Sequence, residues 1–253
     1  QGGHTGATPL SRVMGYMGSD IGTILVAAAG NETGRSHHYL GMFSQKQEME
    51  PVEIRVGEKE RGFSLEFWAQ APEVYSISLL SPTGESIPRV PARLGRSEVA
   101  SFIFEKSVVY IDYQIVEPIS GGFLIVLRFQ DPTPGVWTIQ VYNSLFISGR
   151  YDMWLPMEGF LNPDTVFLKP NPDTTLCVPA TGQQVISTST YNHTDGSLYQ
   201  HSSRGYTRDD KIKPDITAPG VSVYGPGKNN QFVRKTGSSI AAAHVAGAAA
   251  LLL

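Results

Sequence analysis

Residues 235–247 read Lys-Thr-Gly-Ser-Ser-Ile-Ala-Ala-Ala-His-Val-Ala-Gly, and this stretch decides the fold. Two serines are followed by small residues, which predicts a helix that packs closely against a sheet. A serine at a helix start lies among free backbone N–H groups and at the positive end of the helix dipole. Negative charge that develops on a carbonyl oxygen is stabilised there. For an isolated Gly-Ser-Ser tripeptide, the more common explanation is the cap of a core helix.

A second informative segment, Val26-Ala-Ala-Ala-Gly-Asn31-Glu32, ends an apolar run that begins at Thr23. A continuous apolar run predicts a parallel strand covered on both faces by helices. A side-chain amide at the carboxyl edge of that strand can point its N–H2 group into a cleft, and asparagine donates without a competing charge. The alternative is a Gly-Asn turn that only ends the strand.

The residues at both ends of the chain also predict helices. Thr8 and Pro9 form a cap followed by proline at the first helical position. The apolar run from Ile240 to Leu253 is too short to span a bilayer, so we expect a buried helix there. Four apolar residues after Pro9 fall at helical spacing on one face: Leu10, Val13, Met14 and Met17.

The middle of the chain alternates apolar and polar residues with a period of two, interrupted by proline and glycine. Short strands between turn signals predict an antiparallel sandwich or jelly roll, and a block of this length can bury its own core. We therefore predict an α/β parallel-sheet domain in two segments, 1–44 and 171–253, with an inserted all-β jelly-roll domain at 45–170. The alternating sets are Phe63, Leu65 and Phe67; Tyr75, Ile77 and Leu79; Val109, Ile111, Tyr113 and Ile115; Trp137, Ile139 and Val141; and Tyr151, Met153 and Leu155.

The serine-bearing stretch resembles the nucleophile motif of the subtilase family of subtilisin-like serine peptidases, G-T-S-M-A-x-P-H-V-A-G. The longer match favours a nucleophile over a helix cap. The resemblance implies that Ser239 attacks the scissile carbonyl, that its N–H donates to the oxyanion, and that His244 is a packed structural histidine. Ser238 and Ala243 depart from the usual threonine and proline. The matching residues are Gly237, Ser239, Ala241, His244, Val245, Ala246 and Gly247.

The segment ending at Asn31 resembles the family's A-A-G-N segment. This resemblance implies that Asn31 is an oxyanion donor and that Ala28, Ala29 and Gly30 bind substrate. Loss of such a donor costs about 10²–10³ in kcat, a figure measured on subtilisin itself. Residues 202–206 and 213–221 resemble the structural F-S-S-x-G and K-P-D-I-x-A-P-G segments. Asp215 is accordingly expected to be a turn residue.

A serine nucleophile requires a base and a carboxylate that orients the base. In the family both precede the asparagine motif, within D-[ST]-G and H-G-T-H-V-A-G, and neither pattern occurs here. The segment around His4 superficially resembles the histidine pattern. Only a helix and a strand separate His4 from Asn31, whereas more elements follow the triad histidine in the family. We therefore expect His4 to lie in a loop near the substrate cleft and not to be the base. His37 and His38 follow Asn31 and could line the specificity pocket. We expect the chain to lack an N-terminal part that carries the triad Asp and His, and to be inactive alone.

Composition excludes several other classes of function. The net charge of −3 provides no basic surface for nucleic acid. The one cysteine, Cys177, excludes an internal disulfide and is expected to be a small buried hydrophobe. No signal-peptide pattern follows Gln1, and the compartment stays open. No cofactor is implied; calcium is common in the family, but the sequence shows no ligand set.

The distance between the Asn31 and Ser239 motifs is much greater than in compact subtilases. An inserted jelly roll at this place is similar to the Csp-type germination peptidases of spore-forming clostridia. The sequence thus predicts a serine endopeptidase that acts through an acyl-enzyme on protein or peptide substrates, and whose missing N-terminal segment supplies the triad Asp and His. The alternatives are a pseudoprotease or binding module that acts through the jelly roll, and a structural module that rigidifies the peptidase domain.

Overall fold

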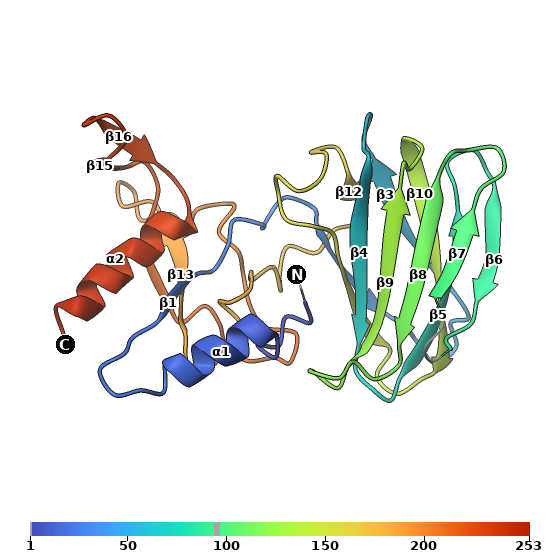
Figure 1. Ribbon diagram of the computed structural model, residues 1–253, viewed down its shortest axis with the longest axis horizontal. Helices are drawn as coiled ribbons and strands as arrows, with labels where there is room; N and C mark the ends of the chain where they lie inside the picture. The colour runs from blue at the N-terminus through green and yellow to red at the C-terminus, as the bar shows by residue number, and fades with distance from the viewer. Residues whose placement is uncertain (1, 94–96) are drawn as a thin grey trace. The chain divides into compact units, whose positions relative to one another are not determined.

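The computed structural model describes residues 2–93 and 97–253, so Gln1 lies outside the described residues. The chain divides into two compact units, one formed by Arg35–Asn171 and the other by Gly2–Gly34 with Pro172–Leu253 (Figure 1). The sequence predicted that the inserted β domain begins at residue 45 and ends at residue 170. Residues 35–44 lie instead with the middle of the chain, because β2 (His38–Met42) pairs with β11 (Arg150–Trp154).

Two antiparallel sheets make up the unit Arg35–Asn171, and one hydrophobic core joins their inner faces. The first sheet has the order β12 (Val166–Phe167), β3 (Glu50–Val56), β10 (Gly135–Leu145), β5 (Val74–Leu80) and β6 (Ser86–Val90). The second has the order β2, β11, β4 (Gly62–Ala69), β9 (Phe123–Gln130), β8 (Val108–Gln114) and β7 (Ser97–Ser101).

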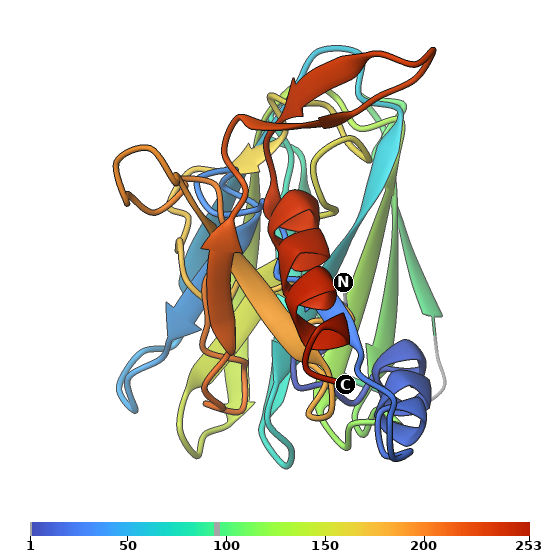
Figure 2. The same cartoon turned by 90° about the vertical axis from the view of Figure 1, so that its left-hand side faces the viewer.

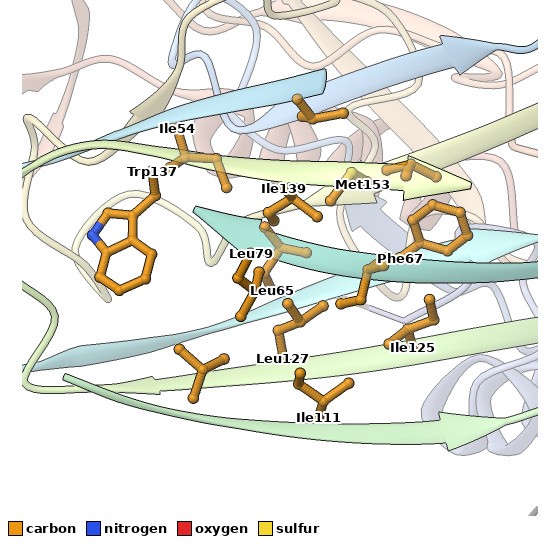
Figure 3. Packing of buried hydrophobic residues seen from close by; sticks show 14 of the residues in the cluster. Ile54, Leu65, Phe67, Leu79, Ile111, Ile125, Leu127, Trp137, Ile139 and Met153 are labelled. Carbon is orange, nitrogen blue, oxygen red and sulfur yellow. The ribbon is translucent and has the colours of Figure 1, made fainter. Parts of the chain in front are cut away.

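The period-two alternation predicted for this unit is confirmed by its burial. Leu65 in β4 and Ile139 in β10 are almost inaccessible to solvent, and their neighbours along each strand are only partly covered. In β5, Ser76 and Ser78 are buried as well as Leu79. Figure 3 shows these leucine and isoleucine side chains and Trp137 filling the space between strands of the two sheets. The unit is therefore a β-sandwich, and the more specific jelly-roll connectivity stays a prediction.

A three-stranded parallel sheet lies at the centre of the other unit, in the order β1 (Val26–Ala28), β13 (Ile186–Tyr191) and β14 (Ile216–Pro219). Successive residues of β1 point to opposite faces. Val26 lies on the face that packs against α2 (Ser238–Ala250). Figure 2 shows this helix lying against the sheet. Ala27 lies on the other face, in a cluster that includes Met14 of α1 (Pro9–Met17). An antiparallel hairpin, β15 (Val223–Pro226) and β16 (Phe232–Lys235), precedes α2.

Helix α1 begins as predicted but buries a different face. The Thr8 hydroxyl accepts a hydrogen bond from Ser11 N–H at 3.3 Å, and Pro9 is the first helical residue. The apolar face predicted by spacing is largely exposed, and the buried residues are Ser11 and Gly15. A Cβ atom on Gly15 would lie 2.8 Å from the Gln184 side-chain oxygen. Because α1 lies this close to Gln184, only small residues fit on its buried face.

Helix α2 is not the buried helix that its apolar sequence predicts. Only Ser238, Ala241 and Val245 are buried, and these face the sheet. His244 is exposed, with Nδ1 3.1 Å from the Ile240 carbonyl oxygen, so the expectation of a packed core histidine is wrong. An apolar helix normally buries its whole circumference, and the described residues cover one side of α2 only. Within residues 2–93 and 97–253, no helix has the length and apolar character needed to cross a membrane.

Candidate active site

The end of β1 and the start of α2 meet in the α/β unit. Ser238 N–H donates to Asn31 Oδ1 at 2.9 Å, although 207 positions separate the two residues in the chain. Gly30 N–H in turn donates to the Ser238 hydroxyl oxygen at 3.1 Å. Because a backbone N–H faces the Asn31 amide, the atom on that side has to be the oxygen. The amide N–H2 group is left to donate to another acceptor.

Ser239 is exposed and is the second residue of α2. The helix follows Gly237, whose φ of 146° favours glycine, and a Cβ there would lie 3.4 Å from Asn31 Nδ2. The Ser239 N–H has no acceptor among the described residues. It therefore belongs to the orphan donors at the positive end of the helix dipole. The start of α2 thus brings together a side-chain amide from Asn31, the backbone N–H of Ser239 and an exposed serine residue.

The turn that carries Asn31 is held by residues from distant parts of the unit. Ala29 N–H donates to Thr188 O at 2.9 Å, and Cys177 N–H donates to Ala29 O at 2.8 Å. Ser203 N–H donates to Gly30 O at 3.0 Å, and the Ser203 hydroxyl accepts Glu32 N–H at 3.0 Å. From the sequence, residues 202–206 were predicted to be a structural segment that positions Ser239. The structure shows that this segment holds the Asn31 turn.

The three residues predicted to bind substrate differ in their exposure. Ala29 is completely buried, and both of its backbone polar groups are bonded within the unit. Ala28 and Gly30 are partly exposed. A Cβ on Gly30 would collide with the Cys177 sulfur, so only glycine fits that position. Substrate can reach Ala28 and Gly30 more directly than Ala29, and the substrate-binding role of the segment stays a prediction.

Cys177 lies beside this turn without being a nucleophile. Burial, followed by the charge of Glu32, raises the pKa of its thiol to about 11. The thiolate is the reactive form, and it is scarce at neutral pH when the pKa is that high. The side chain is partly exposed, so the expectation of a buried residue holds only in part, but its role is packing against Gly30.

Asp215 is a structural carboxylate at the junction of β13 and β14. Its Oδ2 accepts hydrogen bonds from Ser187 N–H and the Ser187 hydroxyl, both at 2.7 Å, and from Lys213 Nζ at 2.6 Å. Burial alone would raise the pKa of Asp215, but the hydrogen bonds from Lys213 and Ser187 outweigh it and lower the pKa. These bonds agree with its predicted role as a turn residue rather than a triad aspartate.

No hydrogen bond joins Ser239 to a histidine or carboxylate within the described part of the chain. His4 is buried in the loop before α1, where its carbonyl oxygen accepts Arg208 N–H at 3.0 Å. His38 belongs to the sandwich: its Nε2 lies 2.8 Å from Asp152 Oδ1, and its ring stacks on Trp154. The expectation that His38 lines a specificity pocket is wrong, because only 1% of the residue is exposed.

Comparison with known proteins agrees with this geometry. Residues 162–253 match the family model described as the Subtilase family. The C5a peptidases of Streptococcus pyogenes serotypes M18 and M1 are 36% identical over 98 residues, which is 39% of this chain and 8% of each relative. The solved structure of the Clostridium perfringens CspB protease covers 100% of this chain with a TM-score of 0.89 and 30% identity, and 52% of that protein is covered.

A parallel sheet whose strand end meets a serine-bearing helix start agrees with a subtilisin-like serine peptidase fold. Residues 162–253 match the subtilase family, and along its length the chain is similar to the CspB protease. It spans about half of that structure and under a tenth of the C5a peptidases. The family resemblance found in the sequence is thereby confirmed.

Proposed function

We propose that this chain is the nucleophile-bearing part of a serine endopeptidase. Ser239 is the nucleophile, and the oxyanion is held by Asn31 Nδ2 and the Ser239 N–H. The single observation that carries this proposal is the 2.9 Å bond from Ser238 N–H to Asn31 Oδ1, which fixes the asparagine amide at the start of α2. The similarity to peptidases of one family supports the same conclusion.

The proposed reaction proceeds through an acyl-enzyme. The Ser239 hydroxyl loses its proton to a base as its oxygen attacks the scissile carbonyl carbon, and the carbonyl oxygen becomes negative. The two donors stabilise that charge, which is the term that usually contributes most to such catalysis. The amine leaves with a proton from the base, and water then hydrolyses the ester to release Ser239. The substrate is a protein or peptide.

The base and its orienting carboxylate are proposed to come from a segment upstream of residue 1. Two features of the α/β unit support a docking face for such a segment. One is the exposed apolar side of α2. The other is a cavity of about 460 Å³ beside it, lined by Tyr224, Val233, Ala243, His244 and Gly247, among others. Burial of this apolar surface would stabilise the assembled unit.

The direct test replaces Ser239 in the protein expressed from the complete reading frame. Ser239→Ala should lower kcat for a peptide substrate by about 10⁶, the loss measured for the equivalent serine of subtilisin. Ser19→Ala, which changes an exposed serine at the end of α1, should leave turnover unchanged. Equal turnover by wild type and Ser239→Ala would refute the proposal.

A second test uses the 253-residue chain alone. We expect no Ser239-dependent turnover, because no histidine or carboxylate among residues 2–93 and 97–253 is hydrogen-bonded to this serine. Addition of the upstream segment as a separate polypeptide should restore turnover. If the complete protein binds peptides without Ser239-dependent hydrolysis, the pseudoprotease alternative replaces the peptidase. The germination role implied by the sequence resemblance stays a prediction.

A further inference from the structure

We infer that the outward face of the first sandwich sheet binds the carboxylates of an acidic peptide segment through Arg89. This exposed residue lies in β6, the last strand of that sheet (Figure 1). The strands β10, β5 and β6 lie side by side, and none of the three contains an aspartate or a glutamate. The inference concerns the sandwich and does not depend on the proposed peptidase reaction.

Three side chains of the neighbouring strands hold the Arg89 guanidinium in place. Its Nε–H donates to the Ser76 hydroxyl oxygen at 2.6 Å, and its Nη2 donates to the Ser144 hydroxyl oxygen at 2.9 Å. The guanidinium carbon lies 4.7 Å from the centre of the Tyr142 ring, which is close enough for a cation–π interaction. An exposed arginine normally samples many rotamers, so a guanidinium that is already fixed loses less conformational entropy when it binds a ligand.

The two bonds to serine use only one edge of the guanidinium. Nε–H and one N–H of Nη2 form that edge, whereas Nη1 and the second N–H of Nη2 form the other edge. This other edge presents two parallel donors, which match the two oxygens of a carboxylate. Within residues 2–93 and 97–253, no ion pair joins Arg89 to a carboxylate. The second edge is therefore available to a carboxylate from outside the sandwich.

Gln140 adds a further donor to the same face. Its Oε1 accepts hydrogen bonds from the Ser78 hydroxyl at 2.6 Å and from the Tyr142 hydroxyl at 3.1 Å. These bonds fix the amide with its oxygen toward the two hydroxyls, so the N–H2 group is left to donate. The face thus offers donors and a positive charge. A complementary ligand has acceptors and a negative charge.

A second exposed arginine of the sandwich shows the arrangement that Arg89 lacks. Arg128 lies in β9 of the second sheet, and its side chain is 55% exposed. Its Nη2 contacts the Asp112 carboxylate of the neighbouring strand β8, so Arg128 has its negative partner within the sheet. Arg89 contacts two hydroxyls and a ring instead, which fix its direction without neutralising its charge.

An acidic peptide segment fits this face better than a free organic acid. One exposed ion pair contributes little to binding, so a single small carboxylate gains too few contacts. A peptide also supplies carbonyl oxygens, which can accept from the Gln140 amide. A second exposed arginine, Arg93, follows Arg89 four positions later, and residues 86–93 contain no acidic residue. The local positive charge therefore attracts a segment that carries several carboxylates.

The test measures the binding of a labelled octapeptide of alternating glutamate and serine by fluorescence anisotropy. The complete protein carries Ser239→Ala, which prevents cleavage of the peptide. The matched peptide with glutamine in place of glutamate should bind at least about tenfold more weakly. Arg89→Met should weaken binding of the glutamate peptide at least about tenfold, and Arg89→Lys, which keeps the charge but not the paired donors, by about threefold. Equal binding of the two peptides, or no saturable binding of either, would overturn the inference.

Arg128→Met is the matched control, because it removes the same charge from an exposed arginine that already has a carboxylate partner. It should change the affinity by less than about twofold, since salt screens exposed charges that lie far apart. Equal losses in Arg89→Met and Arg128→Met would show a nonspecific effect of charge and overturn the inference. Free glutamate at the same carboxylate concentration should not displace the peptide. Displacement would show that a small acid is the ligand and overturn the assignment to a peptide.

Side-chain NMR of isotope-labelled arginine supplies a readout on the guanidinium itself. The Arg89 Nε signal should shift when the glutamate peptide is added, and the Arg128 signal should stay in place. An unshifted Arg89 signal at saturating peptide would overturn the inference. Peptide binding by a complete protein that shows no Ser239-dependent turnover would contradict the proposed peptidase and leave this inference standing. An active peptidase that fails to bind the peptide would overturn this inference alone.

Discussion

The two units of this chain differ in how completely they bury their own apolar residues. In the sandwich, one cluster runs through both sheets and contains large side chains such as Phe67, Ile111 and Trp137. In the α/β unit, the buried apolar clusters are small, with cores of Ala27, Ala180 and Val185 and of Ala218, Ala241 and Val245. The comparison teaches that the sandwich buries its own large apolar side chains in one core, whereas the site-bearing unit leaves one apolar side of α2 exposed.

The largest expected effect on stability comes from the sandwich core. Trp137→Ala should lower the free energy of unfolding of the sandwich by about 3–5 kcal/mol, because a large side chain leaves a cavity. Trp137 is fully buried, its Nε1 donates to Thr133 O at 2.9 Å, and its ring meets those of Phe102 and Phe129 edge-on. Denaturant unfolding followed by circular dichroism measures the loss. The control, Val136→Ala, is 41% exposed and should change little.

The second prediction concerns a buried carboxylate that organises a sandwich loop. Glu73 accepts three backbone N–H groups, from Ile147 at 3.0 Å, Ser148 at 2.8 Å and Gly149 at 2.7 Å. Glu73→Gln removes the charge and leaves a neutral carbonyl oxygen as the acceptor of these donors, so unfolding should become easier by about 2–3 kcal/mol. Glu48→Gln, at an exposed position, is the control for charge alone. Equal stability of the two variants would contradict the role of Glu73.

The third prediction compares the two sides of α2. Ala241 is fully buried against the sheet, so Ala241→Leu should destabilise the α/β unit by about 1–3 kcal/mol through overpacking. Ala246 is exposed, and Ala246→Leu should change the stability of this chain by about 0.5 kcal/mol or less. In the complete protein, Ala246→Leu should nevertheless lower peptidase activity if this side receives the upstream segment. Unchanged activity there would contradict the docking face.

The smallest expected effect is the pH dependence contributed by Asp215. The pKa of Asp215 is lowered in the folded state, so its contribution to stability is fully present above the unfolded pKa of about 3.9 and is lost as pH falls through the lower folded value. Its side chain is 40% exposed, and solvent screening limits the contribution to about 1 kcal/mol or less. Wild type should be more stable than Asp215→Asn at pH 7, and the difference should shrink at pH 3.

The success of sequence reasoning differs between the two units for a physical reason. In the sandwich, Phe63, Leu65 and Phe67 alternate with polar residues because every second side chain of a strand points inward, so the pattern itself encodes burial. In α1, the exposed Leu10 and Val13 follow the helical period as well, yet Ser11 and Gly15 face the interior. Close packing against Gln184 outweighs hydrophobicity there. A periodic pattern predicts the element more reliably than the face it buries.

In the candidate site as well, some features could be predicted from local sequence and others could not. Motifs predicted Asn31 and Ser239, but no local pattern indicated that Ser238 holds Gly30, because 208 positions separate the two residues. The pairing of His38 with Asp152 was equally invisible, because 114 positions separate them. Sequence spacing says nothing of such contacts when more than a hundred residues lie between the partners.

By itself, the sequence determined the resemblance to the subtilase family, the alternating strands of the sandwich, and the cap and first residues of α1, because these depend on contiguous residues and their local conformations. Only the tertiary structure decided that the Asn31 amide oxygen meets the Ser238 N–H and that α2 keeps one side exposed. Hydrogen bonds between distant segments form where the folded chain brings donor and acceptor within about 3 Å, and burial depends on what covers a surface. Neither the partners of such hydrogen bonds nor the exposed side of a helix can be read from local sequence patterns.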